Sequence, residues 1–145
     1  MKLAINYSTQ AAVLLRNGRI KIDYFKCPDW PGLISEASRL SPVAIHFNLT
    51  AGNGRLQQTD WSKIETLLYQ TATPYVSLHL EPKQKYYPGF STGALTPSQH
   101  EQVVDRILKD IEFTSQHVGA ERVILENVPY RDHYGKVLRP AIEPD

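Results

Sequence analysis

Short apolar segments alternate with longer amphipathic segments along this chain. Five segments rich in β-branched and other apolar residues predict strands over residues 3–7, 20–26, 42–47, 75–80 and 122–127. The intervening segments repeat apolar residues at helical spacing, which predicts helices over residues 9–16, 31–40, 61–72 and 97–118. A polar loop at 51–54 and a long loop at 81–95 follow the third and fourth strands. The order of elements is therefore strand, helix, strand, helix.

The helix ends carry local signals. Ser8 and Asp60 can cap the first and third helices by accepting backbone hydrogen bonds, and Pro31 suits the first turn of the second. The Thr-Pro-Ser-Gln sequence at 96–99 combines an N-cap, a first-turn proline and a capping-box glutamine, and Gly119 ends the fourth helix. The predicted apolar stripe of that helix is His100, Val104, Ile107, Ile111 and Val118. Residues 139–145 show neither a helix cap nor a docking strand.

This alternation predicts an α/β fold in a single domain spanning residues 1–145. Each connection is long enough for a right-handed crossover, which needs about a dozen residues, so the sheet should be parallel. Two architectures compete, an open doubly wound sheet and a (β/α)8 TIM barrel. The first strand runs into Asn-Tyr-Ser-Thr at 6–9, with no glycine-rich turn, so a Rossmann cofactor site is not expected.

Composition narrows the possible partners. The 145 residues carry 16 Lys and Arg against 15 Asp and Glu, a formal charge of +1, which does not favour nucleic-acid binding through phosphate neutralisation. No apolar run approaches the roughly 20 residues of a membrane span, and no signal peptide is recognisable, so we expect a cytoplasmic protein without membrane contact. Cys27 is the single cysteine, which excludes an internal disulfide and a thiolate-rich zinc site. A metal site would have to use His and carboxylate ligands.

Three predicted strands end in a protonatable residue at the same position. They read Val-Ala-Ile-His46, Val-Ser-Leu-His79 and Val-Ile-Leu-Glu126. Side chains alternate along a strand, so the large aliphatic residues face one way and the three ionisable residues the other. In a barrel, the second face ends at the carboxyl edge, where barrel enzymes place their chemistry. Two imidazoles and a carboxylate suit zinc, manganese or iron, although either histidine alone could be a structural residue.

Other ionisable and polar residues are weaker candidates. Glu81 shares the strand parity of His79, but a Glu-Pro at a strand exit is typical of a solvated turn. The loop over residues 82–95, rich in aromatic residues at 86–90, could cover a pocket or pack as a compact surface loop. Asn6 and Asn127 could orient substrate or water, or could make loop and turn hydrogen bonds. His133, in a polar loop, indicates neither role. The other candidates have structural explanations, such as helix ends or burial of a small thiol; they are Cys27, His100 and His117.

The sequence Tyr-Val-Ser-Leu-His-Leu-Glu-Pro at 75–82 and Val-Ile-Leu-Glu-Asn-Val-Pro-Tyr at 123–130 resemble motifs of one family. This family is the multinuclear non-haem iron-dependent oxidases, within the xylose-isomerase-like TIM barrels. The sequence ending at His46 resembles the earlier histidine strand of that family, and Ile-Asp-Tyr-Phe at 22–25 resembles its second strand. The resemblance runs through most of the chain.

The resemblance implies a partial (β/α)8 barrel of about five strands and four helices, with His46, His79 and Glu126 as metal ligands. It also implies a divalent transition metal, iron first, and oxidation of a peptide or small-molecule substrate with dioxygen. Two features depart from the family: Lys26 stands where an acidic residue is usual, and the strands that carry the later ligands are not in the chain. We therefore expect the N-terminal portion of such a barrel, either as a fragment or as a short form that a second copy or partner chain completes. We also expect weak metal binding and no turnover by this chain alone.

Two other functions remain open. A sugar isomerase or epimerase of the same superfamily would use Glu126 as ligand or base and Lys26 to polarise a carbonyl. An interaction module without catalysis would instead recruit a partner by strand addition at an open sheet edge.

Overall fold

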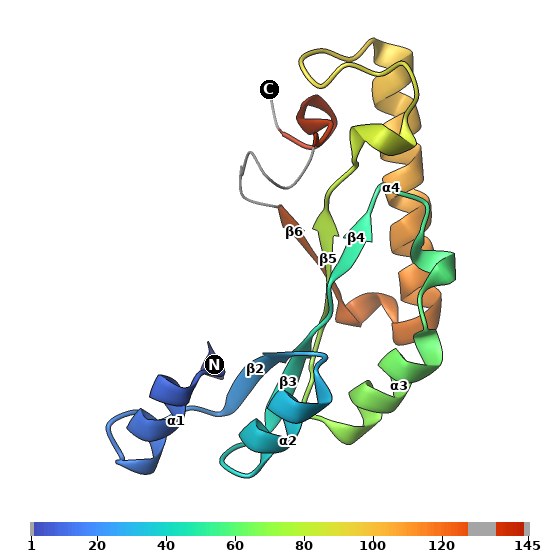
Figure 1. Cartoon of the computed structure of the whole chain (residues 1–145). Coiled ribbons are helices and arrows are strands. Elements are labelled where there is room, and N and C mark those ends of the chain that lie inside the picture. The colour runs from blue at the N-terminus through green and yellow to red at the C-terminus, as the bar shows by residue number, and fades with distance from the viewer. Residues whose placement is uncertain (1, 128–135, 144–145) are drawn as a thin grey trace. The chain divides into compact units, whose positions relative to one another are not determined.

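The computed structural model describes residues 2–127 and 136–143 (Figure 1). The chain divides into two compact units, each made of two segments. The first consists of Met1–Phe47 and Asp60–Val76, and the second of Asn48–Thr59 and Ser77–Asp145. Each unit contains one three-stranded sheet, so the described residues form an α/β structure with two small parallel sheets and four α-helices.

The first unit contains strands β1 (Ala4–Asn6), β2 (Tyr24–Pro28) and β3 (Val43–His46), paired in that order and parallel. Its helices are α1 (Thr9–Arg16), α2 (Pro31–Ser38) and α3 (Trp61–Gln70). The predicted caps are confirmed. The Ser8 hydroxyl accepts from the Ala11 amide, the Asp60 carboxylate accepts from the Lys63 amide, and Pro31 lies in the first turn of α2.

One face of this first sheet forms the core of the unit. Phe25 and Cys27 on β2 and Val43 and Ile45 on β3 are all buried, and α2 packs against both strands. Because side chains alternate along a strand, Lys26 lies on the opposite face of β2. This alternation is the one predicted from the sequence, with the aliphatic residues of β3 on the helix-covered side.

The second unit contains strands β4 (Leu49–Ala51), β5 (Val76–Leu80) and β6 (Val123–Asn127), in the order β4, β5, β6. Strands β4 and β5 are parallel, with Thr50 opposite His79, and β5 begins at Val76, the last residue of the first unit. Helix α4 (Pro97–Val118) contacts β4 and β6. Short 3₁₀ turns lie at Leu56–Gln58, Gln84–Tyr86, Ala120–Arg122 and Arg139–Ala141.

Helix α4 has the predicted start and end. Thr96 and Gln99 form a reciprocal capping box, and Gly119 follows the helix with φ +87°. The predicted stripe was partly wrong, because His100 is exposed. The buried positions are Val103, Ile107, Asp110, Thr114 and Val118. One of them is a carboxylate, which the hydrophobic pattern did not indicate.

The structure differs from the predicted elements in three places. Strand β4 was not predicted, because three residues in a polar context give little periodic signal. The second strand begins at Tyr24, four residues later than expected. An antiparallel pairing at residues 136–138, just before the segment 139–145 that was expected to lack a docking strand, was also not predicted: Gln84 donates its amide to the Lys136 carbonyl at 2.8 Å, and Leu138 donates to the Pro82 carbonyl at 2.8 Å. Leu138 is completely buried by this antiparallel pairing.

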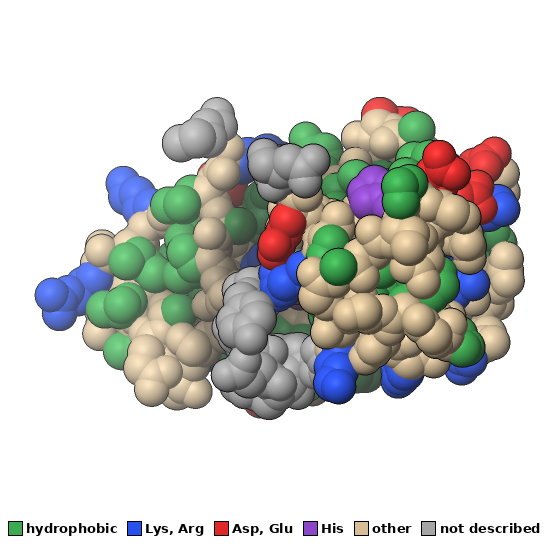
Figure 2. Space-filling view, turned by 90° about the horizontal axis from the view of Figure 1, so that it is seen from above, with side chains coloured by type: hydrophobic (Ala, Val, Ile, Leu, Met, Phe, Trp, Pro, Cys, Tyr) green, Lys and Arg blue, Asp and Glu red, His purple; other side chains and the backbone are tan. Residues whose placement is uncertain are grey.

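Several large hydrophobic side chains remain at the surface, and Figure 2 shows such side chains between charged ones on the face drawn. Strand β6 is notable among them, because Ile124 is 41% exposed and Leu125 is 49% exposed. Neighbouring residues of a strand face opposite sides, so both faces of β6 are partly uncovered. None of the helices in the described residues is both long enough and apolar enough to cross a membrane.

Candidate metal centre

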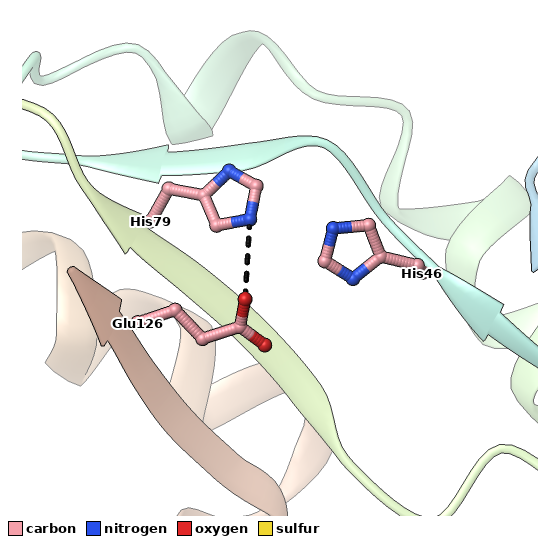
Figure 3. A group of neighbouring side chains, drawn as sticks. All are labelled: His46, His79 and Glu126. Carbon is pink, nitrogen blue, oxygen red and sulfur yellow. Dashed lines mark ion pairs between the residues drawn. The ribbon is translucent and has the colours of Figure 1, made fainter. Parts of the chain in front are cut away.

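The three ionisable residues predicted from strand phase lie near one another. His46 ends β3, His79 is the fourth residue of β5, and Glu126 is the fourth residue of β6. Each offers one ligand atom, and these atoms all lie within 4.8 Å of one another (Figure 3). All three side chains are partly buried. No other such group of His, Cys, Asp and Glu is found among residues 2–127 and 136–143.

His79 and Glu126 form the closest part of this group. The His79 Nε2 and the Glu126 Oε2 are 3.5 Å apart, and Figure 3 shows the two side chains pointing toward one another. A charge-assisted hydrogen bond is shorter, about 2.7–2.9 Å. Two ligands of a tetrahedral ion with bonds of about 2.1 Å are roughly 3.4 Å apart. The observed separation is that of an ion pair and is also close to the spacing of two ligands of one ion.

The number of residues between His46 and Thr50 limits how far apart their main chains can lie. Three residues separate His46 from Thr50, which stands opposite His79 in the parallel register. Four peptide units span at most about 14 Å, which is the upper limit for the separation of the His46 and Thr50 main chains.

Lys26 lies on the same sheet face as His46. It stands opposite Asn6 on β1 and Ala44 on β3, while His46 stands opposite Pro28 two residues further along β2. Residues two apart on a strand share a face. Lys26 and Asn6 are therefore positioned on the side of the first sheet that bears His46, two residues away from His46 along the strand direction.

Glu81 was expected in a solvated turn, and this expectation was wrong. It is only 5% exposed, and its Oε2 lies 3.1 Å from the Lys83 Nζ. Glu81 is not a member of the group with His79 and Glu126. Its carboxylate is therefore neutralised by Lys83, two residues away on the same segment.

Asn53 holds the loop after β4 to the segment after β5. Its side-chain amide donates to the Thr50 Oγ1 at 3.0 Å and to the Glu81 carbonyl at 2.9 Å, and its Oδ1 accepts from the Lys83 amide at 2.9 Å. Thr50 is the register partner of His79. Asn53 therefore fixes the strand ends near this candidate ligand, a role that the sequence alone did not reveal.

Asp110 on α4 anchors the same loop from the helix side. Its Oδ2 accepts from the backbone amides of Gly52, Asn53 and Gly54 at 2.8, 3.2 and 3.1 Å. The Tyr87 hydroxyl donates to the Gly52 carbonyl. Gly52 and Gly54 have φ of +93° and +60°, which brings successive amides to one point. The sequence signal for this arrangement was limited to the two glycines of the loop.

The aromatic loop after β5 is packed at Tyr87. This side chain is 4% exposed, its ring lies 4.5 Å from the Arg106 guanidinium carbon, and the ring of Phe90 is 5.3 Å away. Burial, together with nearby Asp110, raises the pKa of Tyr87 to about 12, against the lowering effect of Arg106. The loop was expected either to cover a pocket or to pack as a compact surface loop. The burial of Tyr87 agrees with the second interpretation at this position.

The remaining candidates have ordinary environments. Cys27 is buried, and burial raises the pKa of its thiol, as expected for a small core residue. His117 lies in the last turn of α4 with its ring 5.1 Å from that of Phe113. Asn127 is exposed, and His133 lies outside the described residues.

Comparison of the chain with known protein families, with curated proteins and with solved structures finds no match. The resemblance to the iron-dependent oxidases therefore stays a prediction from the motifs at 75–82 and 123–130. The geometry of the three side chains is the observation on which function has to be argued.

Proposed function

We propose that His46, His79 and Glu126 bind one divalent transition metal ion. The observation that carries this proposal is the placement of three ligand atoms, from residues far apart in sequence, within 4.8 Å of one another. Two imidazoles and one carboxylate form the donor set of many mononuclear iron, manganese and zinc sites. Neutral imidazoles supply lone pairs, and the Glu126 carboxylate offsets part of the charge of the ion.

The donor set favours iron(II) and an enzyme over a purely structural ion. Structural zinc sites are closed by four protein ligands, whereas a two-histidine, one-carboxylate set leaves coordination positions for water or substrate. When bound, iron would supply activation of dioxygen, and any of these metals would supply Lewis acidity. The residues of this chain would fix the ion, with Asn53 and Asp110 keeping the strand ends rigid around it.

We further propose that the strands are successive strands of a xylose-isomerase-like barrel, in which the chain acts on a peptide or small molecule. The parallel pairing and the alternation of strands and helices support this assignment. An isomerase or epimerase is the enzymatic alternative, with Glu126 as ligand or base. It is favoured by Lys26, which stands on the sheet face that bears His46 and would polarise a substrate carbonyl.

Metal titration tests the proposal. Manganese(II) binding, followed by the loss of the free-ion signal in electron paramagnetic resonance, should weaken at least about 10-fold in His79→Ala and in Glu126→Gln. Zinc(II) and anaerobic iron(II) should compete for the same site. The matched control is His100→Ala, because His100 is an exposed histidine on α4. Equal binding by the wild-type protein and His79→Ala would refute the proposed site.

Strand β6 supports a second candidate, a module that binds a partner by strand addition. Ile124 and Leu125 leave both faces of this terminal strand of the second sheet partly uncovered. Sedimentation equilibrium of the wild-type protein and of Leu125→Lys distinguishes the candidates. Self-association that is lost in Leu125→Lys supports the module, and a monomer that still binds manganese supports the metal centre.

A further inference from the structure

A polar cavity lies in the first unit, between the helices that follow β1 and β2. It has a volume of about 330 Å³ and is lined by the residue that follows β1, by residues of α1, and by α2 with its C-cap residue. The lining residues are Tyr7, Thr9, Ala12, Arg16, Glu36 and Arg39. This volume is at the lower end of the range of small-molecule sites. None of these residues belongs to the candidate metal centre.

Two arginines, Arg16 and Arg39, line this cavity. In the part of the chain that the structure describes, neither the Arg16 nor the Arg39 guanidinium makes a hydrogen bond or an ion pair. Each arginine lies at the C-terminal end of its helix, where the helix dipole favours a cation. The helix dipoles explain why an arginine is favourable at each helix end. They do not explain why the two arginines line the same cavity.

The side chains between the two arginines are polar and held in place. The Tyr7 hydroxyl donates to the Glu36 Oε2 at 3.2 Å, and the Tyr7 ring packs edge-on against buried Phe25 with centroids 5.2 Å apart. Burial and the bond to Glu36 raise the pKa of Tyr7, so the phenol keeps its proton at neutral pH. Thr9 also lines the cavity. The lining residues therefore include two arginines, one glutamate and two residues with hydroxyl groups.

We propose that this cavity binds a small organic phosphate carrying hydroxyl groups. The net charge of the ionisable lining groups is about +1, which suits an anion, and guanidinium groups bind phosphate oxygens through paired N–H donors. Glu36 has a second carboxylate oxygen that can accept from a ligand hydroxyl, and Thr9 can donate to one. The volume exceeds what a bare phosphate fills, which is why the ligand needs an organic part.

Titration with glycerol 3-phosphate, followed by backbone amide chemical shifts of the 145-residue protein, tests this assignment. The expected result is saturable shifts at Thr9, Ala12 and Glu36, and binding at least about 10-fold weaker in Arg16→Gln and in Arg39→Gln. The matched control is Arg19→Gln, which removes the same charge from an exposed arginine that does not line the cavity. Arg19→Gln should bind as the wild-type protein does.

Inorganic phosphate and glycerol serve as separate probes of the two halves of the ligand. Weaker binding of phosphate, with shifts at the same residues, and no binding of glycerol are expected. The proposal is overturned if glycerol 3-phosphate causes no saturable shift up to about 10 mM, an order-of-magnitude limit for a weak specific site. It is also overturned if Arg19→Gln weakens binding as much as Arg16→Gln, which would show general charge attraction.

Discussion

In the first unit, the buried face of the sheet is made of Phe25, Cys27, Val43 and Ile45, and the helix caps are local. In the second unit, the loop after β4 is held by Asp110, Asn53 and Tyr87, which come from different elements. Apolar burial tolerates small shifts, because it is not directional. Buried polar groups require their partners at hydrogen-bond geometry, so changes in the second unit should cost more free energy of unfolding.

The largest expected effect is that of Gly52→Ala in the second unit. A Cβ at this position would lie 2.9 Å from the Pro82 Cβ and 3.0 Å from the Ile107 Cγ1, and its φ of +93° disfavours any L side chain. We expect a loss of about 3 kcal/mol or more in the free energy of unfolding, measured by urea denaturation.

The control for this prediction is Gly18→Ala in the first unit. Gly18 has φ +66°, but a Cβ added there would meet no other atom within 4 Å. The expected loss in the free energy of unfolding is therefore only that of the left-handed backbone conformation, about 1 kcal/mol. Equal losses for the two variants would contradict the difference between the units.

Asp110→Asn should have the next largest effect. The substitution keeps the side-chain shape but removes the charge that accepts from three backbone amides. We expect a loss of about 2 kcal/mol. Asp105→Asn is the matched control, because this carboxylate on the same helix pairs with Lys109 at the surface and should matter by about 0.5 kcal/mol or less. A loss at Asp105 as large as that at Asp110 would be inconsistent with the assigned network.

Tyr87 should make stability fall at high pH. Its pKa in the folded protein is about 12, above the ordinary value of 10, so the folded state holds the proton more tightly than the unfolded state. The resulting stabilisation is fully present below pH 10 and is lost as the pH rises toward 12. We expect Tyr87→Phe to be less stable at about pH 8 by about 1 kcal/mol, and to show a smaller decline above about pH 10.

Urea denaturation at about pH 8 and at intervals between about pH 9.5 and about pH 11.5 measures this effect. Tyr69→Phe controls for general alkaline effects, because Tyr69 is 92% exposed. The prediction fails if Tyr87→Phe and the wild-type protein decline in parallel.

The smallest expected effect is that of a local cap in the first unit. Ser8→Ala removes the hydroxyl that accepts from the Ala11 amide at 3.1 Å, and should cost about 1 kcal/mol. Ser35→Ala, at an exposed position of α2, should change stability by less than about 0.5 kcal/mol, because alanine favours the helix. Thermal unfolding followed by circular dichroism measures both, and a larger loss in Ser35→Ala would show that the cap is not the stabilising feature.

Features that depend on neighbours along the chain were predictable from the sequence. The caps at Ser8 and Asp60 follow from contacts three residues apart, and strand alternation predicted that the three candidate ligands share a phase. The roles of Asn53 and Asp110 were not predictable in this way. Apart from Thr50, which is three residues from Asn53, their partners lie 28 to 58 residues away, so no local pattern could identify them. Strand β4 was missed for a related reason, since three residues pair as a strand only because β5 lies beside them.

The loop at Gly52, Asn53 and Gly54 has the geometry with which proteins hold free anions, three successive amides aimed at one oxygen. Here the anion is built into the polypeptide as Asp110. An internal ligand is present at one equivalent whatever the composition of the solvent, so this loop needs no dissolved salt to keep its shape. As a consequence, the loop cannot bind an external anion while the Asp110 carboxylate accepts from these three amides.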